Sequence, residues 1–176
     1  MYFQVTNILE NVVQPSVTKV RANLRNGVAE FYPGHVDMMG RIDNDVILTE
    51  STVEGRTVTR EFLVRDGLVV ISNGGLTEDA PIGKATYVLV QVAELIELSG
   101  VIDDKKVEDI NNRLKIKDEK LVKALAKIEL ELSSLNDLTL QRLAFESNTG
   151  VIIRGLYDDC QFLNKALESF KGKRKY

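Results

Sequence analysis

The chain has 176 residues, of which 44% are hydrophobic and 28% charged, and its formal net charge is −3. This length supports one or two compact domains with real cores, and the apolar fraction excludes a disordered chain. The acidic balance argues against nucleic acid as the main partner. Because the longest apolar runs are too short to cross a bilayer, we expect a soluble protein that reaches any membrane through partners.

The first half of the chain has the two-residue period of β-strands. Apolar and polar residues alternate over residues 20–25 and again over 57–65, where Arg60 interrupts an inward row that begins at Val58. A third apolar run of β type covers residues 85–95. Several short strands at this spacing predict a sandwich or barrel.

Turn signals separate these strands. Asp66-Gly67 lies between two apolar runs and predicts a tight hairpin, because both positions tolerate a positive φ. Glu54-Gly55 is another turn candidate, and residues 73–84 have the composition of a loop.

The second half of the chain has a helical period. One apolar stripe is expected along a helix, at spacings of four, three, four and three: Leu121, Leu125, Ile128, Leu132 and Leu135. Val107, Ile110 and Leu114 form a shorter stripe before it. A turn near Lys115–Lys117 would fold these two helices into an antiparallel hairpin.

The last thirty or so residues form a third unit. Val151 and the two isoleucines that follow it predict a short β-type run, and Asp158 or Asp159 is expected to cap a final helix. The basic residues 171–176 are expected to be a solvated tail. Cys160, the single cysteine, is expected to be a small buried hydrophobe rather than a reactive thiol.

The sequence shows little sign of catalysis. The phosphate-binding GxxxxGK[ST] motif fails at both ends around Gly83-Lys84, and a single histidine and cysteine leave no metal-binding cluster. A serine triad could use only His35, and no serine stands beside it in sequence. The carboxylates of Asp103 and Asp104 suit a helix N-terminus. We expect no catalytic residue, no metal and no cofactor.

Four segments resemble one protein family. Residues 27–35 read GVAEFYPGH, similar to the strand and Pro-Gly bend of the epsilon subunit of F-type ATP synthases, called delta in mitochondria. Residues 12–15, 62–71 and 88–103 resemble further family segments in the same order. The loop at 73–84 and the residues beyond 146 are longer than the family pattern.

The resemblance implies an α+β fold in three parts. We expect a β-sandwich of short antiparallel strands at residues 1–98 that binds the rotor, followed by an antiparallel helical hairpin at 99–146. Residues 147–176 would be a C-terminal extension with an additional helical segment.

The resemblance also implies a non-catalytic rotor subunit of the central stalk. It would link the gamma shaft to the c-ring in a complex that makes ATP with energy from proton transport. Its C-terminal helices could reach the alpha–beta hexamer and inhibit ATP hydrolysis. No nucleic acid and no direct membrane insertion are expected. The contact turn would comprise Glu30, Phe31, Tyr32, Pro33, Gly34 and His35. His35 is expected to pack in this turn rather than transfer protons.

Some members of the family bind ATP at the start of the hairpin. The matching positions here are Asp103, Lys106 and Arg113, where lysine replaces the first family arginine and loses its planar fork. The alternative for these residues is a capped, solvated helix start.

The expected location is peripheral, on the cytoplasmic face of a bacterial inner membrane or the matrix side of the mitochondrial inner membrane. Two alternative functions stay open: the same subunit in a repurposed F-type-like motor, and a free-standing β-sandwich binding module. A hydrolase built around His35 is a third and less favoured class.

Overall fold

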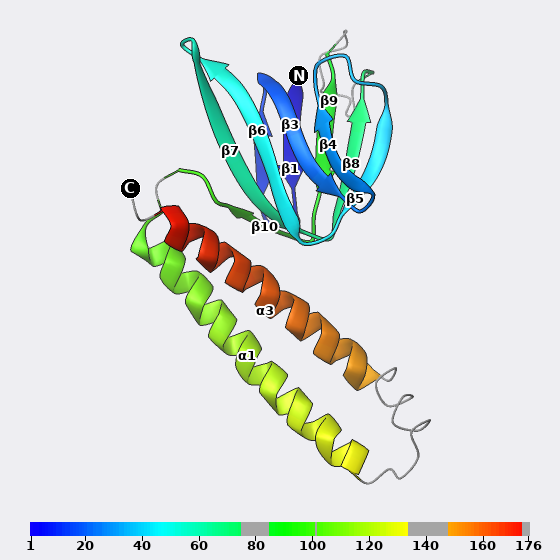
Figure 1. Ribbon diagram of the computed structural model, residues 1–176, viewed down its shortest axis with the longest axis vertical. Coiled ribbons are helices and arrows are strands. Elements are labelled where there is room, and N and C mark those ends of the chain that lie inside the picture. Colours follow the sequence, from blue (N-terminus) through cyan, green and yellow to red (C-terminus); the bar gives the residue numbers. More distant parts are fainter. Residues whose placement is uncertain (75–84, 101, 134–147, 174–176) are drawn as a thin grey trace. The chain divides into compact units, whose positions relative to one another are not determined.

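The computed structural model describes residues 1–74, 85–100, 102–133 and 148–173. The chain forms two compact units, Met1–Val101 and Ile102–Tyr176. The first unit is built of strands and the second of helices (Figure 1). The predicted α+β class, with a β-sandwich followed by paired helices, is confirmed.

Two five-stranded sheets form the first unit. In spatial order, the first sheet contains β2 (Asn11–Gln14), β1 (Tyr2–Thr6), β9 (Tyr87–Gln91), β8 (Gly67–Ser72) and β5 (Met38–Ile42). The second sheet contains β10 (Glu94–Glu97), β7 (Arg56–Arg65), β6 (Asp45–Val53), β3 (Val17–Leu24) and β4 (Gly27–Phe31). Neighbouring strands pair antiparallel except β1 and β9, which are parallel.

Side chains from both sheets form one apolar core. Phe3 from the first sheet and Phe62 from the second meet with ring centroids 5.7 Å apart. Val20 and Ala22 are buried, as the alternation predicted. The prediction that Val58 faces inward is wrong, because the first four residues of β7 are exposed and lie in an extension of the β6–β7 hairpin.

The predicted hairpin at Asp66-Gly67 is also wrong. β7 pairs with β6 and β10, whereas β8 pairs with β5 and β9 in the other sheet. Asp66 does have a positive φ of 50°, but the bend carries the chain between the sheets. A two-residue hairpin turn does occur at Glu54-Gly55, where both φ values are positive and Val53 pairs with Arg56.

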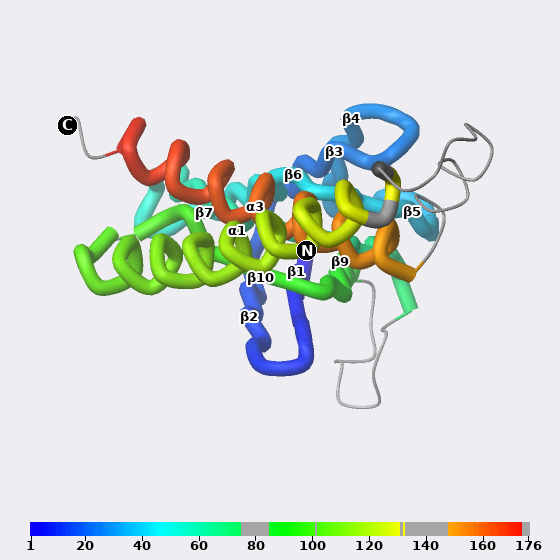
Figure 2. The backbone as a smooth tube through the Cα atoms, turned by 90° about the horizontal axis from the view of Figure 1, so that it is seen from below, coloured from blue at the N-terminus to red at the C-terminus, as the bar shows by residue number. Residues whose placement is uncertain are grey.

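Two long helices form the second unit, α1 (Asp104–Ser133) and α3 (Asn148–Lys173). They lie side by side and antiparallel, so the start of α1 is beside the end of α3 (Figure 2). The predicted turn near Lys115–Lys117 is wrong, since α1 continues through it. No glycine or proline interrupts this helix, so nothing in its sequence stops it.

The C-terminal helical segment is confirmed, but it starts earlier than predicted. Residues 151–153 are helical rather than β-like, and Asp158 and Asp159 lie inside α3 rather than at its start. Branched residues disfavour a helix only slightly and α3 contains no proline, so the helix continues through Val151 and Ile152 although both are exposed. The apolar face of α3 is buried in the second half of the helix: Cys160, Phe162, Leu163, Ala166, Leu167 and Phe170.

The apolar stripe of α1 is only partly buried. Ile110, Leu121 and Ile128 are buried, whereas Leu125 is exposed and Leu135 lies outside the described residues. Cys160 is buried as predicted, and burial raises the pKa of its thiol, which suppresses the reactive thiolate.

One ion pair joins the two helices near their middle. The ammonium of Lys117 donates to the carboxylate of Asp159, which is 9% exposed. A buried carboxylate is costly unless it is paired, so this contact favours one relative register of α1 and α3.

Replacing Asp159 by asparagine should lower the stability of the helical unit by about 1–3 kcal/mol, because the ion pair with Lys117 becomes a weaker hydrogen bond to a neutral amide. Urea unfolding followed by helical circular dichroism measures this. The control is Asp158→Asn at the exposed neighbouring position. If both substitutions changed stability equally, the pair would have no role in holding the register.

Candidate functional site

The predicted contact turn forms a tight corner after β4. Glu30 and Phe31 end the strand, and the next four residues make a turn in which His35 N–H donates to the carbonyl of Tyr32 at 3.0 Å. Pro33 is the second residue of the turn, where the fixed φ of proline is favoured. Gly34 is the third residue and has a φ of +87°, which residues with a side chain avoid. The corner carries the chain from the second sheet toward β5 in the first.

A buried hydroxyl holds this corner in place. Thr86, which is 2% exposed and precedes β9, accepts a hydrogen bond from Gly34 N–H at 2.6 Å. The same hydroxyl donates to Asn73 Oδ1 at 2.8 Å. Thr86 lies 52 positions after Gly34 in the sequence. Its hydroxyl therefore links the corner to the chain after β8.

Asn73 completes the network from the other side. Its Nδ2 donates to the carbonyl of His35 at 2.6 Å and to Asp37 Oδ1 at 3.2 Å. Its backbone N–H donates to Asp37 Oδ1 at 2.9 Å. Since three separate segments satisfy each other's polar groups, the corner is held by contacts within the first unit itself.

The sequence reasoning missed Thr86, Asn73 and Asp37. Asn73 stands at a turn signal, Asn-Gly-Gly, which predicted a loop but gave no partner. Asp37 follows the motif by only two residues. Thr86 carried no signal, because a threonine at the start of an apolar run is ordinary.

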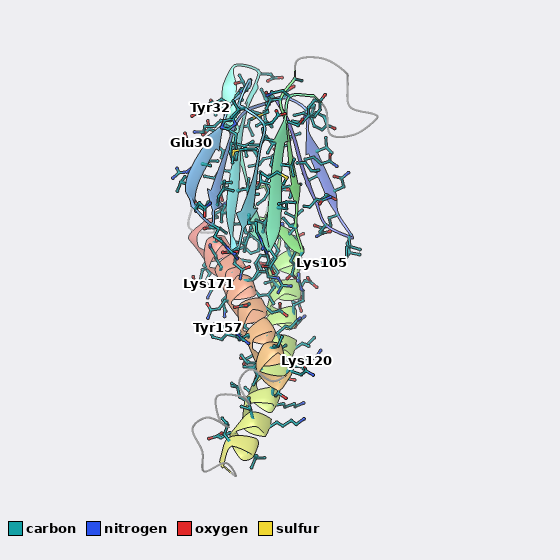
Figure 3. All side chains as sticks on the ribbon, turned by 90° about the vertical axis from the view of Figure 1, so that its right-hand side faces the viewer. Glu30, Tyr32, Lys105, Lys120, Tyr157 and Lys171 are labelled. Atoms are coloured by element: carbon teal, nitrogen blue, oxygen red, sulfur yellow. The ribbon has the colours of Figure 1, made fainter. Side chains whose placement is uncertain are left out.

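The outer surface of the corner, here called the corner surface, consists of Tyr32, Pro33 and Val36. Tyr32 and Val36 are 48% and 72% exposed. Tyr32 and Glu30 lie close together at one end of the first unit (Figure 3), and the phenol donates to Glu30 Oε2 at 2.8 Å. This hydrogen bond to a carboxylate raises the pKa of Tyr32. The corner surface is therefore apolar with one fixed polar edge.

His35 packs as a turn residue. Its ring meets Phe31 edge-on, with centroids 5.2 Å apart and planes at 89°. Nδ1 lies 2.8 Å from the carbonyl of Val36, which can only accept, so Nδ1 carries the proton. With one nitrogen occupied by the backbone, the geometry favours packing over proton transfer.

The three candidate nucleotide-sensing residues are at the start and middle of α1. Asp103 Oδ1 accepts the backbone N–H of Lys106 at 2.7 Å, which makes Asp103 the helix cap. The Lys106 ammonium lies 5.6 Å from the ring centre of Phe170 on α3. Arg113 follows two turns later on the same helix. Asp103 and Lys106 thus have structural roles, and nucleotide sensing stays a prediction.

Two absences concern the described part of the chain. No group of three or more histidine, cysteine, aspartate or glutamate side chains there could hold a metal ion. Among the helices that the structure describes, none is both long and apolar enough to span a bilayer.

Comparisons with known proteins give structural similarity only. No family model matches the sequence, and no curated protein matches it. A chain of the Tetrahymena thermophila mitochondrial ATP synthase, from its central stalk and c-ring, is 12% identical with a TM-score of 0.43, covering 59% of this chain and 71% of that one. A chain of the Euglena gracilis mitochondrial ATP synthase, from the OSCP/F1/c-ring assembly, is 15% identical with a TM-score of 0.48, covering 94% and 79%. Similarity at this level carries no argument about function.

Replacing Thr86 by valine should lower the stability of the first unit by about 1–3 kcal/mol, because Gly34 N–H and Asn73 Oδ1 lose their shared partner at a partly buried site. Urea unfolding followed by tyrosine fluorescence measures the change. The control is Thr59→Val on the exposed part of β7, which should change stability by less than about 0.5 kcal/mol. A Thr86 variant as stable as the control would show that the corner does not depend on this hydroxyl.

Proposed function

We propose that this chain is a non-catalytic rotor subunit in the central stalk of an F-type rotary ATPase or ATP synthase. In this proposal the first unit binds the gamma shaft and the c-ring, so that the three turn together. Catalysis belongs to the alpha–beta hexamer. The chain is peripheral to the membrane and reaches it through these partners.

The observation that carries the proposal is the Tyr-Pro-Gly-His corner. Two of the four family-like segments lie on elements of the expected kind: 27–35 is a strand that ends in a Pro-Gly turn, and 12–15 is the end of a short strand. Residues 62–71 do not, because β7 and β8 lie in different sheets and form no hairpin. Ile102-Asp103 immediately precedes a long helix. The order of a β-sandwich and then paired helices is the order that the resemblance implies.

The geometry of the corner suits a mechanical contact. A rotor element must transmit torque without yielding, and a close-packed sandwich is stiff. The corner surface presents two apolar side chains, Tyr32 and Val36, on a turn fixed by Thr86 and Asn73. A preformed apolar surface loses little conformational entropy on binding, so more of its contact energy contributes to affinity for a partner.

The carboxylate of Glu30 adds a directional polar group beside this surface. It accepts the phenol hydrogen of Tyr32 and lies 3.9 Å from the Lys19 ammonium. These contacts hold Glu30 and Tyr32 in one arrangement at the edge of β4. We assign the corner surface, with Glu30, to the contact with the c-ring or with the foot of the shaft.

Replacing both Pro33 and Gly34 by alanine should uncouple the assembled enzyme, because the turn loses its fixed φ and its left-handed residue. ATP hydrolysis should continue while ATP-driven proton pumping falls, measured in membranes that contain the variant. The control is Val28→Ala, an exposed position near the other end of β4. Full pumping by the double variant would contradict the assigned contact surface.

The helical unit is the regulatory arm in this proposal. Paired helices that rearrange can block rotation in the hydrolysis direction, which is a two-state switch. The same two assays test this with a chain that ends at Asp103. Hydrolysis should rise when the arm is absent, and hydrolysis and coupling at the level of the full chain would remove the regulatory role.

A further inference from the structure

The connection between β1 and β2 presents the two most exposed large apolar side chains of the described residues. Ile8 is 99% exposed and Leu9 is 91% exposed. Figure 2 shows this connection projecting at the edge of the first unit, clear of the other labelled strands. Isolated exposed apolar residues are ordinary, but two adjacent ones at the end of a projecting hairpin are typical of an interaction site.

The hairpin end has a fixed shape. Asn7 Oδ1 accepts the backbone N–H groups of Leu9 at 2.7 Å and Glu10 at 2.6 Å. Asn7 N–H donates to the carbonyl of Glu10 at 2.9 Å, and the Thr6 hydroxyl lies 3.2 Å from the carbonyl of Asn7. The backbone is therefore satisfied locally, while Ile8 and Leu9 extend into solvent.

A fixed turn with two apolar side chains is suited to enter a pocket. Because the backbone is already ordered, binding would cost little conformational entropy beyond the two side chains. Interface energy is concentrated in such anchors rather than spread over the contact area.

The charge of this region argues for a protein pocket and against a lipid surface. Glu10 is the only ionisable side chain among the first 14 residues apart from Tyr2, and no lysine or arginine occurs there. A lone carboxylate is repelled by anionic headgroups and by nucleic acid. Two four-carbon side chains also bury less than a single acyl chain, which itself gives only marginal membrane binding.

We propose that the end of the β1–β2 hairpin is a second docking site, in which Ile8 and Leu9 enter an apolar pocket on a partner protein. The pocket has a basic group or backbone N–H groups beside it that receive the carboxylate of Glu10. This proposal deepens the proposed function by adding an anchor to the rotor, and it rests on that function only for the identity of the partner.

The site is separate from the corner surface. Tyr2 N–H, at the start of β1, donates to the carbonyl of Thr86, which holds the corner. Thr6, at the end of β1, accepts through its carbonyl from Val92 N–H. The two surfaces therefore lie at opposite ends of one strand, whose first and last residues are about 13 Å apart.

Photo-crosslinking in the native assembly tests the proposal. Leu9 is replaced by p-benzoylphenylalanine in the full-length tagged chain, membranes are irradiated, and adducts are identified by mass spectrometry. The same replacement at Val28, which is exposed on β4, is the matched control. We expect position 9 to form an adduct with an apolar segment of one defined protein, and position 28 not to reach that segment.

An affinity measurement with the identified protein completes the test. The double variant Ile8→Ser, Leu9→Ser should bind the purified partner about tenfold or more weakly, whereas Val28→Ser should bind like the natural chain. Both variants change exposed side chains, so circular dichroism should show unaltered folding.

Each outcome decides the proposal. A lipid adduct, no adduct above the control, or unchanged affinity of the double serine variant overturns it. An apolar protein adduct with weakened binding supports it. If that protein belongs to a rotary ATPase, the proposed function is supported as well; if it does not, the docking site stands and the proposed function fails.

Discussion

The buried hydroxyl of Thr86 is the interaction on which the candidate site depends. It serves Gly34 and Asn73 together, so one small side chain joins the crossing between the sheets to the chain after β8. Leaving a polar group without a hydrogen bond inside a protein costs free energy. The conformation in which Thr86 bonds to both Gly34 and Asn73 is therefore preferred over conformations that leave these groups unpaired. Gly34 can adopt its left-handed φ freely, and Thr86 selects that conformation.

Crossings between the sheets explain why the first unit offers contact surfaces at its ends. β4 leads to β5, β7 to β8 and β9 to β10, and each connection leaves one sheet for the other. A sandwich buries the faces of its strands against each other, so its exposed, shape-specific features are turns. The corner surface lies at one end of β1, and the Ile8–Leu9 turn lies at the other. The proposed contacts with two partners would use both ends.

Local patterns predicted elements well and predicted contacts between them poorly. The alternation around Val20 identified β3 and its buried face, and Pro33-Gly34 identified a turn. The Asp66-Gly67 signal predicted the backbone conformation of Asp66 correctly but the pairing of the next strand wrongly. A positive φ bends the chain, but it does not determine which sheet the following strand joins. The expected turn near Lys115–Lys117 failed for a similar reason. Two short stripes were interpreted as two helices, although one uninterrupted helix carries the first stripe and the second as far as Leu132.

The site was predictable as a motif but not as a network. The residues from Glu30 to His35 share one segment, so the sequence brings them together. Thr86 and Asn73 reach the corner only through folding, and Lys117 finds Asp159 from 42 residues away. Such long-range polar pairs depend on tertiary geometry, which a single sequence does not display.

The central claim is that a rigid corner of this chain is held within a rotary motor, and purification from native membranes tests it most directly. The full-length chain carries a tag, and its partners and ATPase activity are measured after mild solubilisation. The account predicts a shaft protein in fixed proportion to this chain, together with ATP hydrolysis. A chain that elutes alone, while the ATPase activity elutes in other fractions, would contradict it.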